Sequence, residues 1–237
     1  MEKGTIQPVL LFTDGHHRDL IDSHWLAVDA AIAAIREWYA LELGRPFKNL
    51  VLPTVVLKAI DSRLYYSNPL ECLAQTCEAQ GCPNRGPGFM PYAYLGFAPG
   101  LGGYAGAVHW DGQVGLAMLG DACLKAISGD SPACEAIIGG APIRCSVDGQ
   151  RGAIAHELMH TLGWGEHTDT PGLDLSSAEY QEFPRCHLPE QVKAHLLTPP
   201  WDVFLQEKPP DSSNALAALR SIRQSLDDVI RQLETSN

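Results

Sequence analysis

The 237-residue sequence has no long apolar run, no basic cluster and no internal repeat. Its longest apolar stretches, at residues 25–35 and 50–57, are interrupted by Asp29 and Pro53, which excludes a membrane-spanning helix. Lys and Arg never form a cluster of more than two, and 17 basic residues stand against 28 acidic ones, giving a net charge of −11. This balance argues against nucleic acid and anionic membranes as partners.

The sequence also has no Cys-x-x-Cys pair, which argues against a thiolate zinc ribbon or a redox motif. Because most of its seven cysteines lie in loop-rich segments, we expect six of them to form disulfides and one to remain unpaired. That expectation implies a secreted or extracellular protein. Residues 1–4 lack an apolar leader, so we expect a signal peptide to have been removed. Reduced structural cysteines are the alternative. The seven are Cys72, Cys77, Cys82, Cys123, Cys134, Cys145 and Cys186.

The order of periodic segments predicts an α+β domain. Strands at 8–12 and 49–59 flank a helix at 23–44, which indicates a βαβ unit. Residues 60–103 are interpreted as loops, and residues 104–110 and 113–119 as a hairpin around Asp111 and Gly112. Short helices are expected at 122–127 and near 134–138. Beyond a hinge at 209–213, an apolar stripe predicts a final helix, for which packing on its own domain is favoured over oligomerisation.

The segment from His156 to His160 has the form His-Glu-x-x-His, between the turn signal at 148–149 and Gly163. Steps of about 100° per residue place the two histidines on one face of a helix and the apolar residues on the other. Neutral imidazoles at this spacing suit Zn²⁺, and Glu157 suits a general base that deprotonates water. With Gly163 and a following histidine, the pattern is expected by chance only on the order of 10⁻⁴ to 10⁻³ times in such a chain.

The segment HELMHTLGWGEH resembles the metzincin zinc-peptidase signature, HExxHxxGxxH, over about a dozen residues. The resemblance implies an extracellular endopeptidase fold with a horizontal cleft, in which a twisted mixed sheet with an antiparallel edge strand precedes the active-site helix. It also implies that a third histidine after Gly163 completes the zinc site. Because a downstream tyrosine stabilises the oxyanion in some metzincins, Tyr180 is a candidate for that role.

The sequence departs from the signature at two points. The third histidine, His167, comes one residue late, and the signature spacing falls on Glu166. We expect His167 to be the third ligand because Gly165 can absorb the extra residue, and we keep Glu166 as the alternative. Metzincins also carry a methionine in a turn beneath the zinc, whereas here no methionine follows Met159. Either another residue fills that turn or the C-terminal subdomain diverges from the family.

Other interpretations remain open. In a thermolysin-like gluzincin the third ligand would be a later glutamate, and Glu179 and Glu182 lie at suitable distances in sequence from His160. A non-catalytic binding module stabilised by zinc is a further alternative. Cys186 lies in a Pro-Arg-Cys segment similar to the cysteine switch of matrix metallopeptidase propeptides, which implies a latency ligand.

We therefore expect a zinc-dependent endopeptidase acting on peptides or proteins, with Zn²⁺ on His156, His160 and His167 and with Glu157 as the general base. The expected fold is a metzincin-like catalytic domain with a backing helix and an active-site helix. Residues 1–163 would form the subdomain of the sheet and active-site helix, and residues 164–208 a small irregular subdomain completing the zinc site. Residues 209–237 would form the hinge and the C-terminal amphipathic helix.

Overall fold

The computed structural model describes residues 2–15, 18–82, 92–110, 114–129, 137–138, 141–142, 146–167 and 174–207. Met1–Leu205 form one compact unit, and Gln206–Asn237 form a second. The expected C-terminal helix lies outside the described residues. No helix in the described part is long and apolar enough to cross a membrane.

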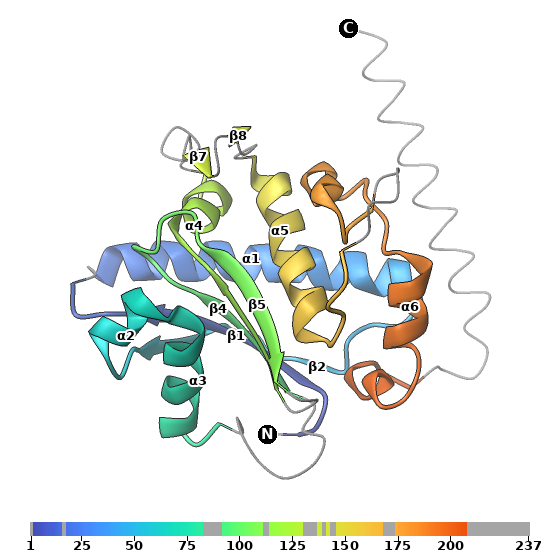
Figure 1. Cartoon of the computed structure of the whole chain (residues 1–237), viewed down its shortest axis with the longest axis horizontal. Coiled ribbons are helices and arrows are strands. Elements are labelled where there is room, and N and C mark those ends of the chain that lie inside the picture. The colour runs from blue at the N-terminus through green and yellow to red at the C-terminus, as the bar shows by residue number, and fades with distance from the viewer. Residues whose placement is uncertain are drawn as a thin grey trace, which may run out of the picture. The chain divides into compact units, whose positions relative to one another are not determined.

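A mixed six-stranded sheet forms the centre of the first unit (Figure 1). Its order is β2-β1-β4-β6-β5, and β3 pairs with β1 further along the same edge as β2. Every pairing is parallel except that of β5 with β6, so β5 is an antiparallel edge strand. The strands are β1 (Thr5–Phe12), β2 (Asn49–Leu50), β3 (Val55–Lys58), β4 (Tyr92–Phe97), β5 (Ala105–Trp110) and β6 (Val114–Leu119).

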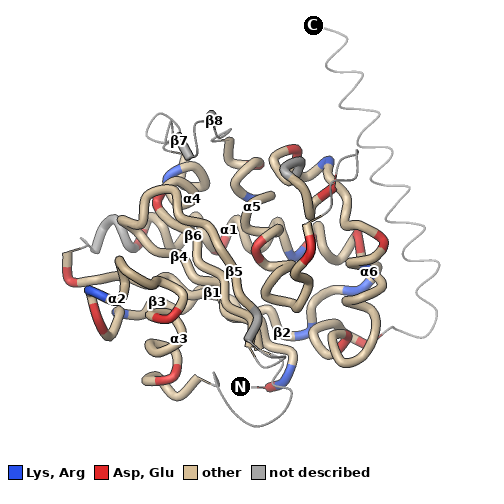
Figure 2. Tube along the Cα trace, in the orientation of Figure 1, with Lys and Arg blue, Asp and Glu red and all other residues tan. Residues whose placement is uncertain are grey.

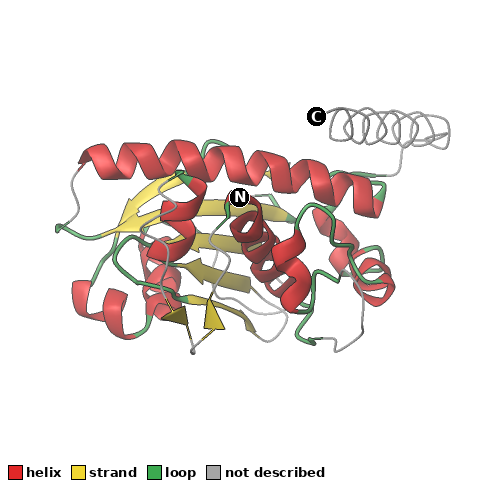
Figure 3. Ribbon diagram, turned by 90° about the horizontal axis from the view of Figure 1, so that it is seen from above, coloured by secondary structure: helices red, strands yellow, loops and turns green. Residues whose placement is uncertain are grey.

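The central strands are covered by helices on both faces (Figure 3). In β1, Ile6 and Leu10 pack toward α1 (Arg18–Leu43) and α5 (Val147–Thr161), whereas Val9 and Leu11 pack toward α2 (Ser62–Ser67) and α3 (Pro69–Ala79). Side chains alternate between the two faces of a strand, so burial on both faces requires the nearly continuous apolar sequence seen in this strand.

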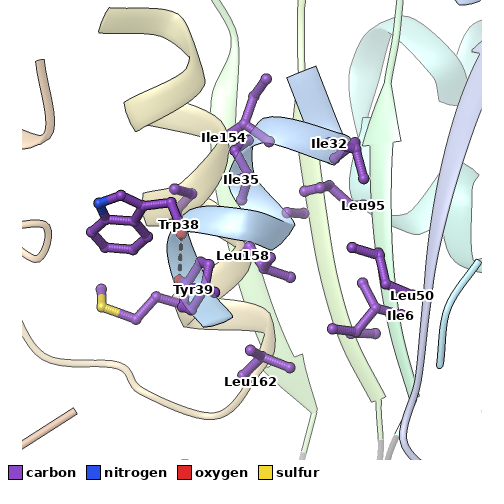
Figure 4. Close-up of a cluster of buried hydrophobic side chains, with 14 of the residues drawn as sticks. Ile6, Ile32, Ile35, Trp38, Tyr39, Leu50, Leu95, Ile154, Leu158 and Leu162 are labelled. Atoms are coloured by element: carbon purple, nitrogen blue, oxygen red, sulfur yellow. Dashed lines mark hydrogen bonds between the residues drawn. The ribbon is translucent and has the colours of Figure 1, made fainter. Parts of the chain in front are cut away.

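Helix α1 is the predicted backing helix, and it buries one apolar stripe against the sheet and α5 (Figure 4). Ile32, Ile35 and Tyr39 on this stripe are fully buried. The Tyr39 hydroxyl donates a hydrogen bond of 2.8 Å to the Ala155 carbonyl in α5. Gly44 follows the helix with φ 65°, in the left-handed region that commonly ends a helix. The contact with Ala155 links α1 directly to the helix that carries the His-Glu-x-x-His segment.

Two glycines bring α5 close to its neighbours. A Cβ on Gly115 of β6 would lie 1.8 Å from the Thr161 carbonyl oxygen, and one on Gly152 of α5 would lie 1.8 Å from the Tyr180 carbonyl oxygen. Only a residue without a side chain allows such an approach. Helix α5 therefore packs tightly between the sheet and the short helix η2 (Ala178–Glu182).

The expected fold class is confirmed: a mixed sheet with an antiparallel edge strand, a backing helix and an active-site helix. The hairpin strands and the helix α4 (Asp121–Ile127) also agree with the sequence. The strand expected at 49–59 is divided into β2 and β3, with a cis Leu52-Pro53 bond between them.

Two local predictions were wrong. Residues 60–103 contain α2, α3 and β4 rather than loops alone. Asp61 caps α2, accepting from the backbone of Arg63 and Leu64, and Asn68 caps α3 at Pro69. Burial against the sheet stabilises both helices despite their weak periodicity. Residues 137–138, at the end of the helix expected near 134–138, instead pair with 141–142 as the strands β7 (Ile137–Ile138) and β8 (Ala141–Pro142), and residues 134–136 lie outside the described part.

The prediction of three disulfides was also wrong. The five described cysteines are free thiols, and Cys82 alone among them is not buried. Cys72 and Cys77 lie on α3 in the core beneath the sheet, and Cys186 lies in the core formed by α1 and α5. These thiols act as small apolar side chains, as in the alternative of reduced structural cysteines. The argument for an oxidising compartment loses its support. The side chains of Cys134 and Cys145 lie outside the described residues.

Lys and Arg are scattered over several elements of the described chain, while Asp and Glu occur throughout (Figure 2).

Candidate metal centre

Three histidines converge beside the end of α5. His156 and His160 project from consecutive turns of the helix, and His167 comes from the segment that follows it. Each offers one nitrogen, and these three nitrogens lie within 4.8 Å of one another. The Nε2 atoms of His156 and His160 are 3.1 Å apart. We call these residues the histidine triad.

Two main-chain carbonyls orient the helical histidines. Nδ1 of His156 lies 2.7 Å from the Leu175 oxygen, and Nδ1 of His160 lies 2.6 Å from the Trp164 oxygen. A carbonyl only accepts hydrogen bonds, so each Nδ1 carries the proton, and each Nε2 presents its lone pair to the centre of the triad. Both carbonyls come from the segment that follows α5.

The chemistry of this donor set fits a bound cation. Two lone pairs facing each other at 3.1 Å repel unless a positive charge lies between them. In a tetrahedral zinc site, Zn–N distances of about 2.0–2.1 Å separate neighbouring nitrogens by roughly 3.3 Å. The observed separation is close to that value.

Burial keeps the helical histidines neutral. It lowers the pKa of His156 to about 4 and also lowers the pKa of His160. Because a neutral imidazole is the form that binds a metal, both side chains can bind without first releasing a proton at neutral pH.

A sharp turn at Gly163 redirects the chain after α5. Gly163 has φ 89°, and a Cβ there would lie 2.2 Å from the Trp201 ring. The segment after this turn is one residue longer than in the metzincin signature. His167 nevertheless reaches the triad, whereas Glu166 remains exposed. Glu166, the alternative third ligand, is not a member of the described group.

Glu157 lies beside the triad in a cleft of about 550 Å³. The outer strand β5 forms one wall through Ala105, Gly106, Ala107 and Val108, and the turn at 163–165 contributes to the lining. Burial raises the pKa of Glu157 to about 7. A carboxyl group with this pKa can both accept and donate a proton near neutral pH.

Tyr180 and the turn at Asp174 lie on the His156 side of the triad. The Tyr180 ring lies 5.1 Å from the His156 ring, measured between centroids and at an interplanar angle of 45°. Beside it, the Asp174 carboxylate accepts from Ser176 N at 2.7 Å and Ser176 Oγ at 2.9 Å, which shapes the turn that presents Leu175. Tyr180 is thus placed near the triad as a neighbour of His156.

The remaining candidates are not members of the described ligand group. Cys186 is fully buried in the core, and burial raises the pKa of its thiol to about 12, which gives the latency hypothesis no support. Glu182 pairs with Arg185, and neither it nor Glu179, whose side chain is not described, belongs to the described group.

Sequence reasoning missed the Leu175 and Trp164 carbonyls, because every residue carries a carbonyl and composition does not mark which one will accept a hydrogen bond. A signal for one of them was present, since Asp174, with Ser176 and Ser177 after Leu175, is the composition of a tight turn.

Neither known family profiles nor curated protein sequences match this chain. Among solved structures it resembles catalytically inactive OgpA from Akkermansia muciniphila in complex with an O-glycopeptide substrate, glycodrosocin, with a TM-score of 0.50 and 13% identity. That alignment covers 82% of this chain and 60% of OgpA. Archaemetzincin from Methanopyrus kandleri aligns over 82% of this chain and 94% of its own, with a TM-score of 0.41 and 14% identity. The chain therefore shares its overall fold with OgpA.

Proposed function

We propose that this protein is a zinc-dependent endopeptidase. The observation that carries the proposal is the histidine triad, with the lone pairs of His156 and His160 directed at each other and with Glu157 in the adjoining cleft. His156, His160 and His167 would hold the metal. Three protein ligands leave one position of a tetrahedral site open, as catalytic zinc sites do.

Bound Zn²⁺ would act as a Lewis acid toward the scissile carbonyl and acidify a nearby water molecule. Glu157 would take the proton from that water and deliver it to the leaving amine, two roles that its raised pKa suits. The carbonyls of Leu175 and Trp164 would keep the imidazoles of His156 and His160 in the protonation state that binds the metal. Tyr180, beside His156, is the candidate oxyanion stabiliser.

The cleft suggests a peptide in an extended conformation as the substrate. One wall of the cleft is the edge strand β5, and an edge strand can bind an extended peptide as an additional strand. The side chains of Ala105, Gly106 and Ala107 are small or absent, so this wall leaves room for bulky substrate side chains. The O-glycopeptide bound to the OgpA fold supports testing glycosylated as well as plain peptides.

The test combines metal analysis with a peptide-library digest by wild-type protein and Glu157→Ala, using libraries with and without O-glycans. We expect about one zinc per chain in both proteins and cleavage by the wild type alone. Zinc binding without cleavage of either library would instead indicate a zinc-stabilised binding module. Absence of zinc from the wild-type protein would contradict the proposal at its first step.

A further inference from the structure

Three aromatic rings pack together at the turn that contains Gly163. His195, near the end of α6 (Glu190–Leu196), contacts both Trp164 and Trp201, the first residue of η3 (Trp201–Phe204). The ring centroids of His195 and Trp164 are 5.7 Å apart in an edge-to-face arrangement, and those of His195 and Trp201 are 4.9 Å apart with the rings tilted. We call these three rings the aromatic cluster. His195 is not a member of the described metal-ligand group, and the proposed reaction gives it no task.

His195 binds the last carbonyl of the active-site helix. Its Nε2 lies 3.0 Å from the oxygen of Leu162, the residue that caps α5. Carbonyls at the end of a helix have no partner within the helix and must find one elsewhere. Because the carbonyl accepts, His195 Nε2 must carry the proton. Burial lowers the pKa of His195, which leaves the ring neutral at neutral pH.

Trp201 packs on the next residue of the same turn. Its ring occupies the space where a side chain on Gly163 would lie, with a ring atom 2.2 Å from the Cβ position. The residue after Gly163 is Trp164, whose carbonyl accepts from Nδ1 of His160 at 2.6 Å. The turn is therefore held at Leu162 by a hydrogen bond, at Gly163 by ring contact and at Trp164 by its bond to a triad histidine.

We propose that His195 is a positioning residue for the metal centre: by holding the Leu162 carbonyl, it fixes the turn whose Trp164 carbonyl orients His160. The inference rests on the proposed function in that it requires a metal at the triad. It assigns to α6, a helix outside the cleft, a share in metal affinity. Partners that orient metal-binding histidines typically contribute tenfold to a hundredfold to affinity.

The test measures the Zn²⁺ dissociation constant by competition with a chelating dye, in wild-type protein and two variants. His195→Phe keeps a ring in the aromatic cluster but removes the donor, whereas His195→Gln keeps a donor and removes the ring. We expect Phe to raise the dissociation constant about tenfold or more and Gln to stay within about threefold of wild type. His187→Gln serves as the matched control, because its side chain is 66% exposed and lies on the segment before α6.

Equal affinities of wild type and His195→Phe would overturn the proposal, as would equal losses in the Phe and Gln variants accompanied by equal drops in the melting temperature of the metal-free protein. If the Phe variant does not fold, ¹⁵N NMR of the wild-type imidazoles decides. The Nε2–H tautomer of His195 is expected, and a proton on Nδ1 alone would overturn the proposal. If the wild type binds no zinc, the proposed function and this inference fail together. If the wild type binds zinc but the Phe variant loses nothing, only this inference fails.

Discussion

Helix α5 and the segment that follows it contribute to the same centre in different ways. The helix places His156 and His160 four residues apart, largely buried against the sheet, so that their spacing depends on helix geometry alone. The described residues that follow the helix, 162–167 and 174–175, contribute exposed His167 and the two carbonyls of Trp164 and Leu175.

The comparison shows that helix α5 sets the spacing of two ligands, whereas the residues after the helix set the orientation of those ligands. A regular helix fixes the backbone positions from which the two imidazole side chains project, but it does not fix the orientation of their rings. The rings are oriented by hydrogen bonds that they donate to carbonyls 4 and 19 positions further along the chain. Metal affinity should therefore depend on both regions, and each can be altered separately.

The largest effect is expected from removing the ligands themselves. His160→Ala should weaken zinc binding at least a hundredfold, because loss of a direct ligand should exceed the tenfold to hundredfold cost of losing an orienting partner. His167→Ala should cost less, about tenfold to a hundredfold, because an exposed loop ligand must be ordered before it binds. Chelator competition measures both. Equal losses would show that the loop histidine is held as firmly as the helical one.

The next effect, on folding stability rather than on zinc affinity, is expected at the turn between the two regions. Gly163→Ala should destabilise the protein by about 2–4 kcal/mol, because alanine is strained at φ 89° and its methyl group would displace the Trp201 ring. Gly165→Ala is the matched control, since its Cβ would meet no atom within 4 Å, and we expect a change within about 0.5 kcal/mol. Urea denaturation of the metal-free proteins measures both. Similar values for the two variants would contradict the assigned role of Trp201.

A third prediction concerns the carboxylate that α5 buries beside the triad. Burial raises the pKa of Glu157 from 4.5 to about 7, so ionisation of Glu157 disfavours the folded state of the metal-free protein. Between these two pH values the unfolded chain is ionised while the folded chain is not, and the penalty grows with pH and then levels off. Metal-free Glu157→Gln should therefore match wild type near pH 4.5 and be more stable by about 2–3 kcal/mol above pH 7.

The check is urea denaturation of both proteins at pH 5 and pH 8. Asp148→Asn, which alters an exposed carboxylate in the first turn of the same helix, should show no such pH-dependent gain. A Gln variant whose advantage is the same at both pH values would rule out the ionisation of Glu157 as the cause.

The smallest effect is expected at Glu166. Its side chain is exposed and is not a member of the described ligand group, so Glu166→Gln should leave zinc affinity within about twofold of wild type. A loss comparable with that of His167→Ala would assign the third ligand to Glu166 instead. This comparison decides directly between the two residues at which the sequence departs from the metzincin spacing.

Much of the regular architecture could be predicted from the sequence. The stripe of Ile32, Ile35 and Tyr39 predicted α1, and Asp111 and Gly112 located the hairpin of β5 and β6. These signals are local, because periodicity and turn composition reflect the shape of one element. Helices α2 and α3 were missed because their stability comes from burial against the far face of the sheet, which periodicity over a few residues does not reveal.

For the cysteines, the sequence pattern led to a wrong prediction. Their number and loop-rich surroundings favoured disulfides, yet the described thiols are free and all but Cys82 are buried. Count and spacing do not tell whether two sulfur atoms meet. A buried cysteine packs like any small apolar residue, so the sequence pattern is the same in both cases.

By itself, the sequence determined the helical spacing of His156 and His160, the adjacent Glu157 and the hairpin of β5 and β6, since each follows from local geometry, and the resemblance to metzincins implied the mixed sheet. Only the tertiary structure decided that His167 joins the triad, that Leu175 and Trp164 orient the helical imidazoles, and that Cys186 belongs to the core. These features depend on close approaches at Gly163, Gly152 and Gly115 between segments distant in the chain. Such approaches are set by how whole elements pack, and short-range sequence patterns do not encode that packing.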